Sequence, residues 1–423
     1  MQPLKILFVT PQYPPAIGGT EQLVAGWAEE LVRRGHQAHV FTTRSTHQPT
    51  WRGSLPSYEE RGGVRVWRFR QWERGRRTMR LMDWGYSGFL RTGQRRYEAG
   101  IWLAEGPVAP GLFAALLVRS RSYDAIISMS ASTLTSLVVC LVSPRAHTVW
   151  INAPLLHLDQ LLPRAITGRQ HILSSASLLL PVSGIEASVL QTRFGIPGSR
   201  IQVIPPIVPM PAEVTAQTAS RAQLGLPADA FIVAFLARQV AYKGFHLTVE
   251  AISRLLREFP NLMLVSAGPK DTADNLPDAT RSEGFCMRWR NLGTVDEETK
   301  WRLLSACDVL CMPSTGEAFG IVYAEAWVCG KPVIGANSGA VPGVITHGVD
   351  GFVVEPGDVE GLAGYLAKLQ QHPDLARKMG QAGRRKVLTH FTARSVGDAL
   401  EGALARALRL GRNKRLRIAS ESG

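Results

Sequence analysis

Short apolar runs alternate with longer amphipathic segments along the chain. The first run, residues 4–10 (LKILFVT), has no regular polar positions, which is typical of a strand buried on both faces of a parallel sheet. A Gly-Gly turn follows at residues 18–19, then a helical segment that reaches about Arg34, and then a second apolar run at residues 37–43. This β-α-β pattern predicts an α/β architecture built on parallel sheets.

The pattern restarts in the second half of the chain. Residues 205–227 hold five prolines and many small polar residues, which is the composition of a linker. The apolar run FIVAFLA at residues 231–237 then begins a new sheet. Because 423 residues suffice for two domains, we predict an N-terminal domain at 1–204, a linker at 205–229 and a C-terminal domain at 230–391.

Polar residues that could take part in binding or catalysis are concentrated in residues 313–356. A buried strand is predicted at 307–312, and a helix from about Ile321. Glu317 lies in the loop before this helix, whose N-terminus offers free N–H groups and a positive dipole end to phosphates and hydroxyl-rich ligands. Glu325 lies within the otherwise apolar helix, where an unpaired carboxylate is costly. Either glutamate alone would more often be an ordinary surface acid.

This segment resembles the signature of retaining GT-B glycosyltransferases of family four. Their two glutamates separated by seven residues stand here at Glu317 and Glu325, among the motifs EAFG, AEA, GKPVI and GVDGFVVEPGD. The pair of glutamates alone has little predictive value, but together with the surrounding motifs it is specific to this family. The resemblance implies that Glu317 lies near the donor sugar and Glu325 near the ribose. It also implies that backbone N–H groups of Ala318, Phe319 and Gly320 help to hold the sugar and phosphates.

The resemblance extends over nearly the whole chain and is strongest from Phe231 to Asp358. It implies the α/β GT-B fold, in which two Rossmann-like doubly wound domains face each other across a cleft, with a final helix at 392–410 packing back on the N-terminal domain. The implied activity is hexosyltransferase-like: a sugar moves, with retention, from a nucleoside-diphosphate sugar to an acceptor hydroxyl. We predict no cofactor, because the nucleotide sugar is a substrate. We predict no metal either, because no DxD-like carboxylate pair or His/Cys cluster is present.

Two basic residues follow the strand at 231–237. Arg238 comes directly after it and Lys243 five residues later, before a predicted helix. A guanidinium and an ammonium at a strand-to-helix turn can clamp a diphosphate, although this spacing alone equally fits two solvent-exposed charges. The resemblance to the family element G-R-x-x-x-x-K-G, with Ala237 in place of its first glycine, favours the clamp. It implies that Arg238 and Lys243 neutralise the leaving nucleoside diphosphate.

Three glycines and one valine complete the predicted donor site. Gly18 and Gly19 form either an ordinary turn or a phosphate-binding turn at a helix N-terminus, and the sequence has no GxGxxG to support a nicotinamide site. The resemblance favours contact between Gly18-Gly19 and the donor diphosphate. It also aligns Gly268 with a family G-x-G-P turn and places Val295 beside the nucleotide base.

Two positions depart from the family pattern. Where members carry a histidine, this chain has Asn152, which can bond a sugar hydroxyl but cannot relay a proton at neutral pH. His157 is a candidate substitute, although an isolated loop histidine is more often incidental. The segment 205–209 (PPIVP) replaces the usual P-N-G-V-D. Asn152 and His157 are therefore the predicted acceptor-side residues, and a catalytically weak sugar-nucleotide-binding protein remains an alternative.

The chain is basic, with a formal net charge of +14 and a pI near 10.0, which favours an anionic partner. Residues 61–96 hold eleven arginines, two acids and six interleaved aromatic residues. This composition suits an anionic membrane surface, nucleic acid, or simply a solvated charged face. We favour the membrane over nucleic acid because the chain has no recognisable nucleic-acid-binding motif.

The remaining features bear on location. No apolar span of 20 residues without charge is present, and no secretory leader precedes Pro11. The five cysteines include no C-x-x-C pair, which favours reduced thiols in the cytosol. We therefore predict a cytoplasmic protein, peripheral on the inner face of the membrane, whose acceptor is a saccharide or a lipid-linked intermediate in polysaccharide or glycolipid synthesis.

Overall fold

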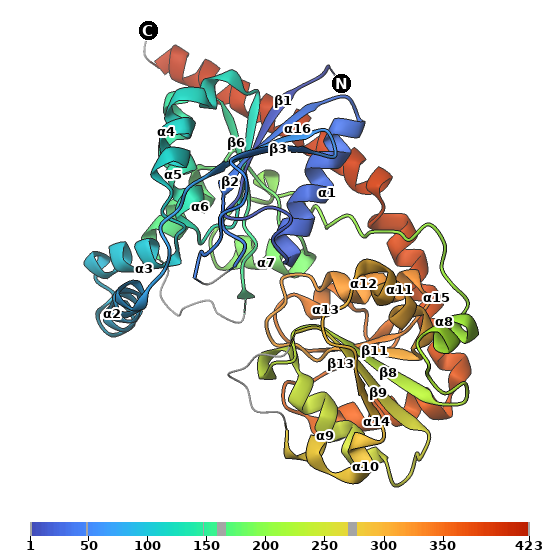
Figure 1. Ribbon diagram of the computed structural model, residues 1–423. Helices are drawn as coiled ribbons and strands as arrows, with labels where there is room; N and C mark the ends of the chain where they lie inside the picture. The colour runs from blue at the N-terminus through green and yellow to red at the C-terminus, as the bar shows by residue number, and fades with distance from the viewer. Residues whose placement is uncertain (1, 48–49, 147, 159–165, 270–276, 422–423) are drawn as a thin grey trace. The chain divides into compact units, whose positions relative to one another are not determined.

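The chain divides into two compact α/β units, each with a largely parallel sheet covered by helices on both faces (Figure 1). The computed structural model describes residues 2–47, 50–146, 148–158, 166–269 and 277–421. Unit 1 comprises Met1–Leu156, Gln160–Ile207 and Ala393–Gly423, and unit 2 comprises His157–Asp159 and Val208–Thr392. The α/β class predicted from the apolar runs is confirmed in both units.

The described strands of unit 1 form one sheet in the order β3-β4-β2-β1-β5-β6-β7. All neighbours are parallel except β3 and β4. The central strand β1 pairs Ile6 with Ala38 of β2 and with Ala125 of β5, and its apolar residues are fully buried, as its sequence predicts. The strands are β1 (Lys5–Val9), β2 (Gln37–Thr43), β3 (Tyr58–Arg61), β4 (Val64–Phe69), β5 (Ala125–Met129), β6 (Val149–Ala153) and β7 (Leu178–Leu179).

The helices of unit 1 include the last helix of the chain, which packs on α1 and β6. Arg34, at the end of α1, fixes this contact through Asp398 at 2.7 Å and Glu401 at 2.8 Å. The helices are α1 (Gly19–Arg33), α2 (Arg76–Thr92), α3 (Glu98–Glu105), α4 (Pro110–Arg119), α5 (Leu134–Ala146), α6 (Thr167–Ser175), α7 (Gly184–Thr192) and α16 (Ala393–Glu421).

The described strands of unit 2 are all parallel, in the order β10-β9-β8-β11-β12-β13. The strands are β8 (Phe231–Leu236), β9 (Leu262–Ala267), β10 (Trp289–Asn291), β11 (Val309–Cys311), β12 (Val333–Ala336) and β13 (Gly351–Val354). The helices are α8 (Gln217–Gln223), α9 (Phe245–Leu255), α10 (Glu283–Cys286), α11 (Glu297–Ala306), α12 (Ile321–Val328), α13 (Val341–Val344), α14 (Val359–Gln371) and α15 (Pro373–His390). Numbered within the unit, the strand order is 3-2-1-4-5-6, so the order reverses between β8 and β11. Ligands of doubly wound sheets bind at the carboxyl ends of the strands at this reversal.

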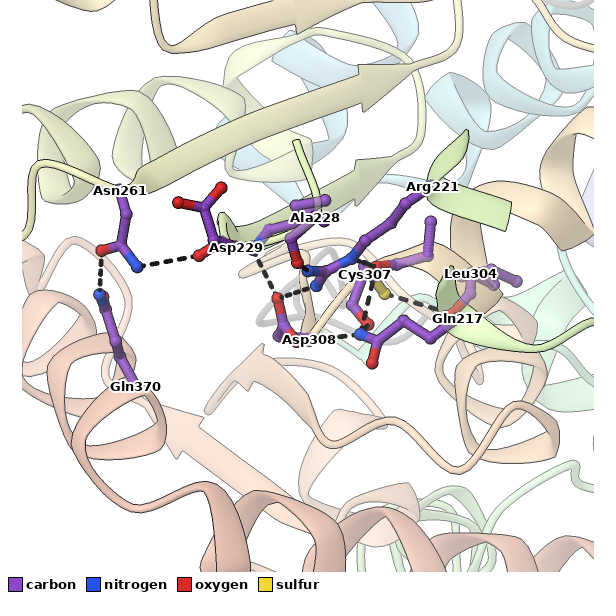
Figure 2. Close-up of polar contacts among 11 residues, drawn as sticks. Gln217, Arg221, Ala228, Asp229, Asn261, Leu304, Cys307, Asp308 and Gln370 are labelled. Carbon is purple, nitrogen blue, oxygen red and sulfur yellow. Dashed lines mark hydrogen bonds and ion pairs between the residues drawn. The ribbon is translucent and has the colours of Figure 1, made fainter. Parts of the chain in front are cut away.

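The opposite, amino end of β11 is where the segment entering unit 2 is anchored (Figure 2). Arg221 of α8 donates to Asp308 at 2.7 Å and to the Ala228 carbonyl at 2.6 Å. Gln217 donates to the other oxygen of Asp308 at 3.0 Å, and Asp308 also accepts the Ile232 N–H at 2.7 Å. This cluster connects α8 to the amino ends of β8 and β11. It lies at the end of these strands opposite the carboxyl ends, where a ligand is expected to bind.

A buried carboxyl ties together the loops after β6 and β7. Glu186 of α7 is 2% exposed, and it accepts the N–H groups of Leu156 and Val182, each at 2.8 Å. Burial raises the pKa of this carboxyl to about 7, although the N–H groups oppose the rise.

We expect Glu186 to make unit 1 less stable as the pH rises. Between its ordinary pKa of 4.5 and about 7, the unfolded chain has released the proton while the folded chain still holds it, so the free energy of unfolding falls by about 3 kcal/mol over this range. Denaturant unfolding from pH 4.5 to 8 measures this fall in the free energy of unfolding. Glu186→Gln should remove the part of the pH dependence that this carboxyl causes, and the control Glu258→Gln, at an exposed glutamate, should retain it. A difference between wild type and Glu186→Gln that does not change with pH contradicts the assignment.

Candidate functional site

The chain segments after β8 and β11 are pressed together at the carboxyl edge of the unit 2 sheet. Gly244, which precedes α9, has a φ of 83°, and a Cβ at this position would overlap the carbonyl of Pro313, just after β11. The Thr315 N–H donates to the Tyr242 carbonyl at 2.9 Å. A residue other than glycine at position 244 would therefore both strain the backbone and separate the two segments.

This contact brings together the predicted residues Arg238, Lys243 and Glu317. Lys243 forms an ion pair with Glu317, and both side chains are largely buried, with 18% and 12% of their surface exposed. Arg238 is exposed and bonds the Tyr242 hydroxyl. The cationic groups of Arg238 and Lys243 lie 5.5 Å and 5.3 Å from the centre of the Tyr242 ring. Tyr242, which the sequence patterns did not single out, thus orients both cations.

The loop 317–320 leads directly into α12. Gly320 has a φ of 79°, and a Cβ here would overlap the ring of Tyr323, whose hydroxyl donates to the Met312 carbonyl at 2.6 Å. Phe319 is 7% exposed and packs edge-on against Phe391 with 5.3 Å between ring centres. The predicted residues Ala318 to Gly320 therefore form a rigid turn before the helix N-terminus.

Gly268 joins the same edge from β9. Its φ of 128° and the carbonyl of Ala237, which a Cβ would overlap, both require glycine. Gln239 donates to the Gly268 carbonyl at 3.1 Å and to Asn291 at 2.8 Å, linking the ends of β8, β9 and β10. Val295 is half-buried in the loop after β10. Gln239 was not predicted, because only the fold brings it within bonding distance of Gly268 and Asn291.

Glu325 has a different partner from Glu317. It is 4% exposed on α12 and lies 2.7 Å from the ammonium of Lys300 on α11, which also lies 2.8 Å from Glu297. Burial raises the pKa of Glu325, and Lys300 opposes that rise. For Lys300, burial acts to lower the pKa, but its two carboxylate neighbours outweigh it and the pKa is raised. Lys300 is thus the missed partner that favours the charged form of Glu325 within an apolar helix.

In unit 1 the predicted Gly18-Gly19 turn lies at the N-terminus of α1. Gly18 is extended, with a φ of 172°, and the carboxylate of Glu21 occupies the space that a Cβ would fill. Glu21 is 8% exposed, and burial raises its pKa. The loop before the turn is held by Arg68, which donates to the Pro14 carbonyl at 2.5 Å and to Glu59 at 2.6 Å. Arg68 therefore supports this loop, whereas most of the arginine-rich stretch is exposed.

The structure does not bring the two acceptor-side candidates together. Asn152 is fully buried in β6, where its amide donates to the Ser128 carbonyl at 3.1 Å and hydroxyl at 2.9 Å. His157 is exposed in the loop beyond that strand. The buried Asn152 side chain therefore connects β6 to β5. No contact among the described residues links it to His157.

The arginine-rich stretch continues from β4 into α2, which packs on α3. We call its exposed part the α2 surface; it presents arginines beside large apolar side chains: Arg76, Arg77, Arg80, Arg91, Met79, Trp84 and Leu90. Within the described ranges, no single helix is long and apolar enough to cross a membrane. Two consecutive helical segments, 95–105 and 110–122, reach that length and apolarity only when taken together, and they are bent by 97° relative to each other. No group of three or more potential metal ligands occurs among the described His, Cys, Asp and Glu residues.

The two doubly wound units have the fold of GT-B glycosyltransferases, and basic and acidic side chains meet at the strand-order reversal of the second unit. Residues 216–386 match the family model of glycosyl transferases group 1, and residues 18–206 match the model of the glycosyl transferase 4-like domain. Together the two models match most of the chain, and the resemblance to group 1 glycosyltransferases that its motifs predict is confirmed.

The chain matches several named relatives and solved structures over nearly their whole length. The D-inositol 3-phosphate glycosyltransferase of Saccharomonospora viridis is 28% identical over 95% of this chain and 92% of its own. The GDP-mannose-dependent phosphatidylinositol monomannoside mannosyltransferase of Mycolicibacterium smegmatis is 26% identical over 95% of this chain and 98% of its own. The Anabaena protein HepE, solved with UDP, is 20% identical, with a TM-score of 0.69 over 95% of this chain and 100% of its own. The chain is therefore similar to full-length glycosyltransferases.

Proposed function

We propose that this glycosyltransferase moves a sugar, with retention, from a nucleoside-diphosphate sugar to an acceptor hydroxyl. The observation that carries the proposal is the convergence of Arg238, Lys243 and Glu317 where the strand order of unit 2 reverses. Arg238 and Lys243 stabilise the charge that develops on the leaving diphosphate, and stabilisation of this kind commonly contributes most to the rate enhancement. Glu317 orients Lys243 and binds hydroxyls of the donor sugar.

The rest of the unit 2 edge binds the nucleotide. Glu325, held by Lys300, accepts the ribose hydroxyls, and Val295 lies beside the base. Free N–H groups of the turn 318–320 bind the sugar and phosphates at the N-terminus of α12. Gly268 allows the backbone to approach the nucleotide closely, and the turn at 18–19 contacts the diphosphate of the donor.

The reaction proceeds by front-side attack and without a metal. The acceptor oxygen bonds to the anomeric carbon on the face that the diphosphate leaves. The diphosphate takes the bond's electron pair and the proton of the acceptor hydroxyl. No covalent sugar–enzyme intermediate is needed, and the two cations provide the charge stabilisation that a metal ion provides elsewhere.

The acceptor is a saccharide or lipid-linked intermediate of glycolipid or polysaccharide synthesis, reached at the inner face of the membrane. The named relatives that act on inositol phosphate and phosphatidylinositol mannoside support this class. The α2 surface supports peripheral attachment, because arginines attract anionic headgroups while Trp84 and Leu90 enter the interface.

A thermal-shift panel with UDP, GDP and ADP tests the proposal on wild type and Arg238→Ala. Arg238 is exposed, so its loss leaves the fold intact. One nucleotide at 100 times its Kd stabilises the wild type by about 2.7 kcal/mol, and Arg238→Ala removes most of that shift. The anomeric configuration of the product, read by proton NMR with that nucleotide's sugar, then tests retention. Absence of a shift with every nucleotide, or an inverted product, contradicts the proposal.

A further inference from the structure

A hollow of about 850 Å³ lies in unit 1, and none of its lining residues belongs to the proposed donor site. It is at the carboxyl ends of two neighbouring strands, because Arg44 directly follows β2 and Arg70 directly follows β4. Its volume is in the range of small-molecule sites. We call it the Arg44–Arg70 hollow, and it is lined by Arg44, Gly53, Ser54, Arg70, Gln71, Trp72, Glu73, Pro110 and Gly111.

Arg44 is held in place before any ligand binds. Its guanidinium donates to the carbonyls of Leu55 and Ser54, and its backbone N–H donates to Gln71 at 3.0 Å. Gln71 is 6% exposed and donates to the Trp51 carbonyl at 2.8 Å. These bonds use only part of the Arg44 guanidinium. A cation held by neutral carbonyls keeps its charge available for an anion.

Arg70 adds a second, exposed guanidinium, and among the described residues neither Arg70 nor Arg44 has a carboxylate partner. Other arginines nearby are paired: Arg68 with Glu59, and Arg52 with Glu73 at 3.9 Å. The N-terminus of α4, at Pro110 and Gly111, adds its dipole to the same wall. Two uncompensated guanidiniums at a helix N-terminus suit a phosphate, which guanidinium groups bind in pairs of parallel hydrogen bonds.

The remaining wall suits a sugar ring. Trp72 is 65% exposed, although its backbone N–H is fixed to the Val108 carbonyl at 2.9 Å. An exposed indole at the mouth of a hollow offers a flat face to the C–H surface of a pyranose or cyclitol ring. Glu73, at the same wall, can accept ring hydroxyls.

We propose that the Arg44–Arg70 hollow is the acceptor subsite and binds a phosphorylated saccharide, with Arg44 and Arg70 on the phosphate and Trp72 on the ring. The proposal rests on the proposed transferase function, whose acceptor class it specifies. The same phosphate chemistry is available from a soluble sugar phosphate or from the headgroup of a phosphoglycolipid.

Calorimetric titration of the full chain with glucose 6-phosphate and with glucose tests the subsite. We expect glucose 6-phosphate to bind at least tenfold more tightly than glucose. Arg70→Ala lowers affinity for glucose 6-phosphate by at least tenfold and leaves that for glucose unchanged. The matched control is Arg119→Ala, which removes an exposed arginine at the other end of α4 and leaves both affinities unchanged. Equal affinities of wild type and Arg70→Ala, or an equal loss in Arg119→Ala, overturn the proposal.

Vesicles distinguish the two sources of phosphate. Phosphatidylinositol and phosphatidylserine, each at the same fraction in phosphatidylcholine, present the same charge to the α2 surface. A phosphoglycolipid acceptor gives greater retention on phosphatidylinositol, and Arg70→Ala loses that excess. A soluble acceptor gives equal retention together with Arg70-dependent binding of glucose 6-phosphate. If neither Arg70-dependent effect is seen, the hollow is not an acceptor subsite.

The donor experiment remains separate from this result. The donor experiment depends on Arg238 of unit 2, and the residues of the hollow all lie in unit 1. A protein that binds glucose 6-phosphate through Arg70 but binds no nucleotide contradicts the transferase proposal alone. A protein that binds a nucleotide normally but binds glucose 6-phosphate equally well with and without Arg70 contradicts the hollow alone.

Discussion

Lys243→Ala is expected to lower kcat by about a hundredfold to a thousandfold, the usual cost of removing one group that stabilises charge in a transition state. The ammonium is held between Glu317 and the Tyr242 ring, so it is already positioned when the diphosphate leaves. Both side chains of this ion pair are largely buried, so removing the ammonium leaves the Glu317 carboxylate without its partner and should also destabilise the fold, by about 1 to 3 kcal/mol. Release of nucleoside diphosphate from the sugar nucleotide identified by the thermal-shift panel measures kcat, and thermal unfolding measures stability.

Two variants separate charge from geometry. Lys243→Arg keeps the cation but replaces a compact ammonium by a planar fork, so we expect it to recover only part of the rate. Arg254→Ala removes an exposed cation of α9 whose partners are Glu250 and Glu360, and it should leave kcat within about twofold of wild type. A kcat for Lys243→Ala within tenfold of wild type would remove Lys243 from the reaction.

The sequence predicts this fold well where buried strands are nearly uniform in composition. The apolar runs at 4–10, 37–43 and 231–237 correspond to β1, β2 and β8, because strands covered on both faces have no polar side. The short antiparallel strand β3 was missed, since its residues Tyr58 to Arg61 are mostly exposed and polar. The last helix continues past the predicted end at 410, to Glu421, through a basic segment that has no Pro or Gly stop signal after Gly411.

Residues of the candidate site could be predicted only where they lie in a recognisable local sequence motif. Arg238, Lys243 and Glu317 stand in short recognisable patterns, and the strand order explains why 74 residues of separation between Lys243 and Glu317 end in an ion pair. Arg68 lies in a stretch that composition alone marks as surface, yet its side chain is fully buried. Besides Glu59, its partner is the Pro14 carbonyl, which lies 54 residues away in the sequence. Pairings of this kind follow from topology and have no local signal.

Lys300→Met is expected to lower the free energy of unfolding by about 3 kcal/mol at neutral pH, because it leaves the carboxylate of Glu325 buried without its partner. Burial already raises the pKa of Glu325, and Lys300 is the neighbour that opposes the rise. Without Lys300 the pKa rises further, so the destabilisation is present above that pKa and is lost as the pH falls through it. Denaturant unfolding of the variant across pH 5 to 8 should therefore show stability that increases toward acid, relative to wild type.

The double variant Lys300→Met/Glu325→Leu separates the structural role of this pair from its proposed role in binding. Replacing both charges by apolar groups restores most of the lost stability, because no unpaired charge remains buried. It does not restore binding of the nucleotide, since the carboxylate that accepts the ribose hydroxyls is gone, and we expect affinity at least tenfold below wild type by calorimetry. Wild-type affinity in this stable double variant would show that Glu325 serves only the packing of α12 on α11, and the ribose would then need another partner.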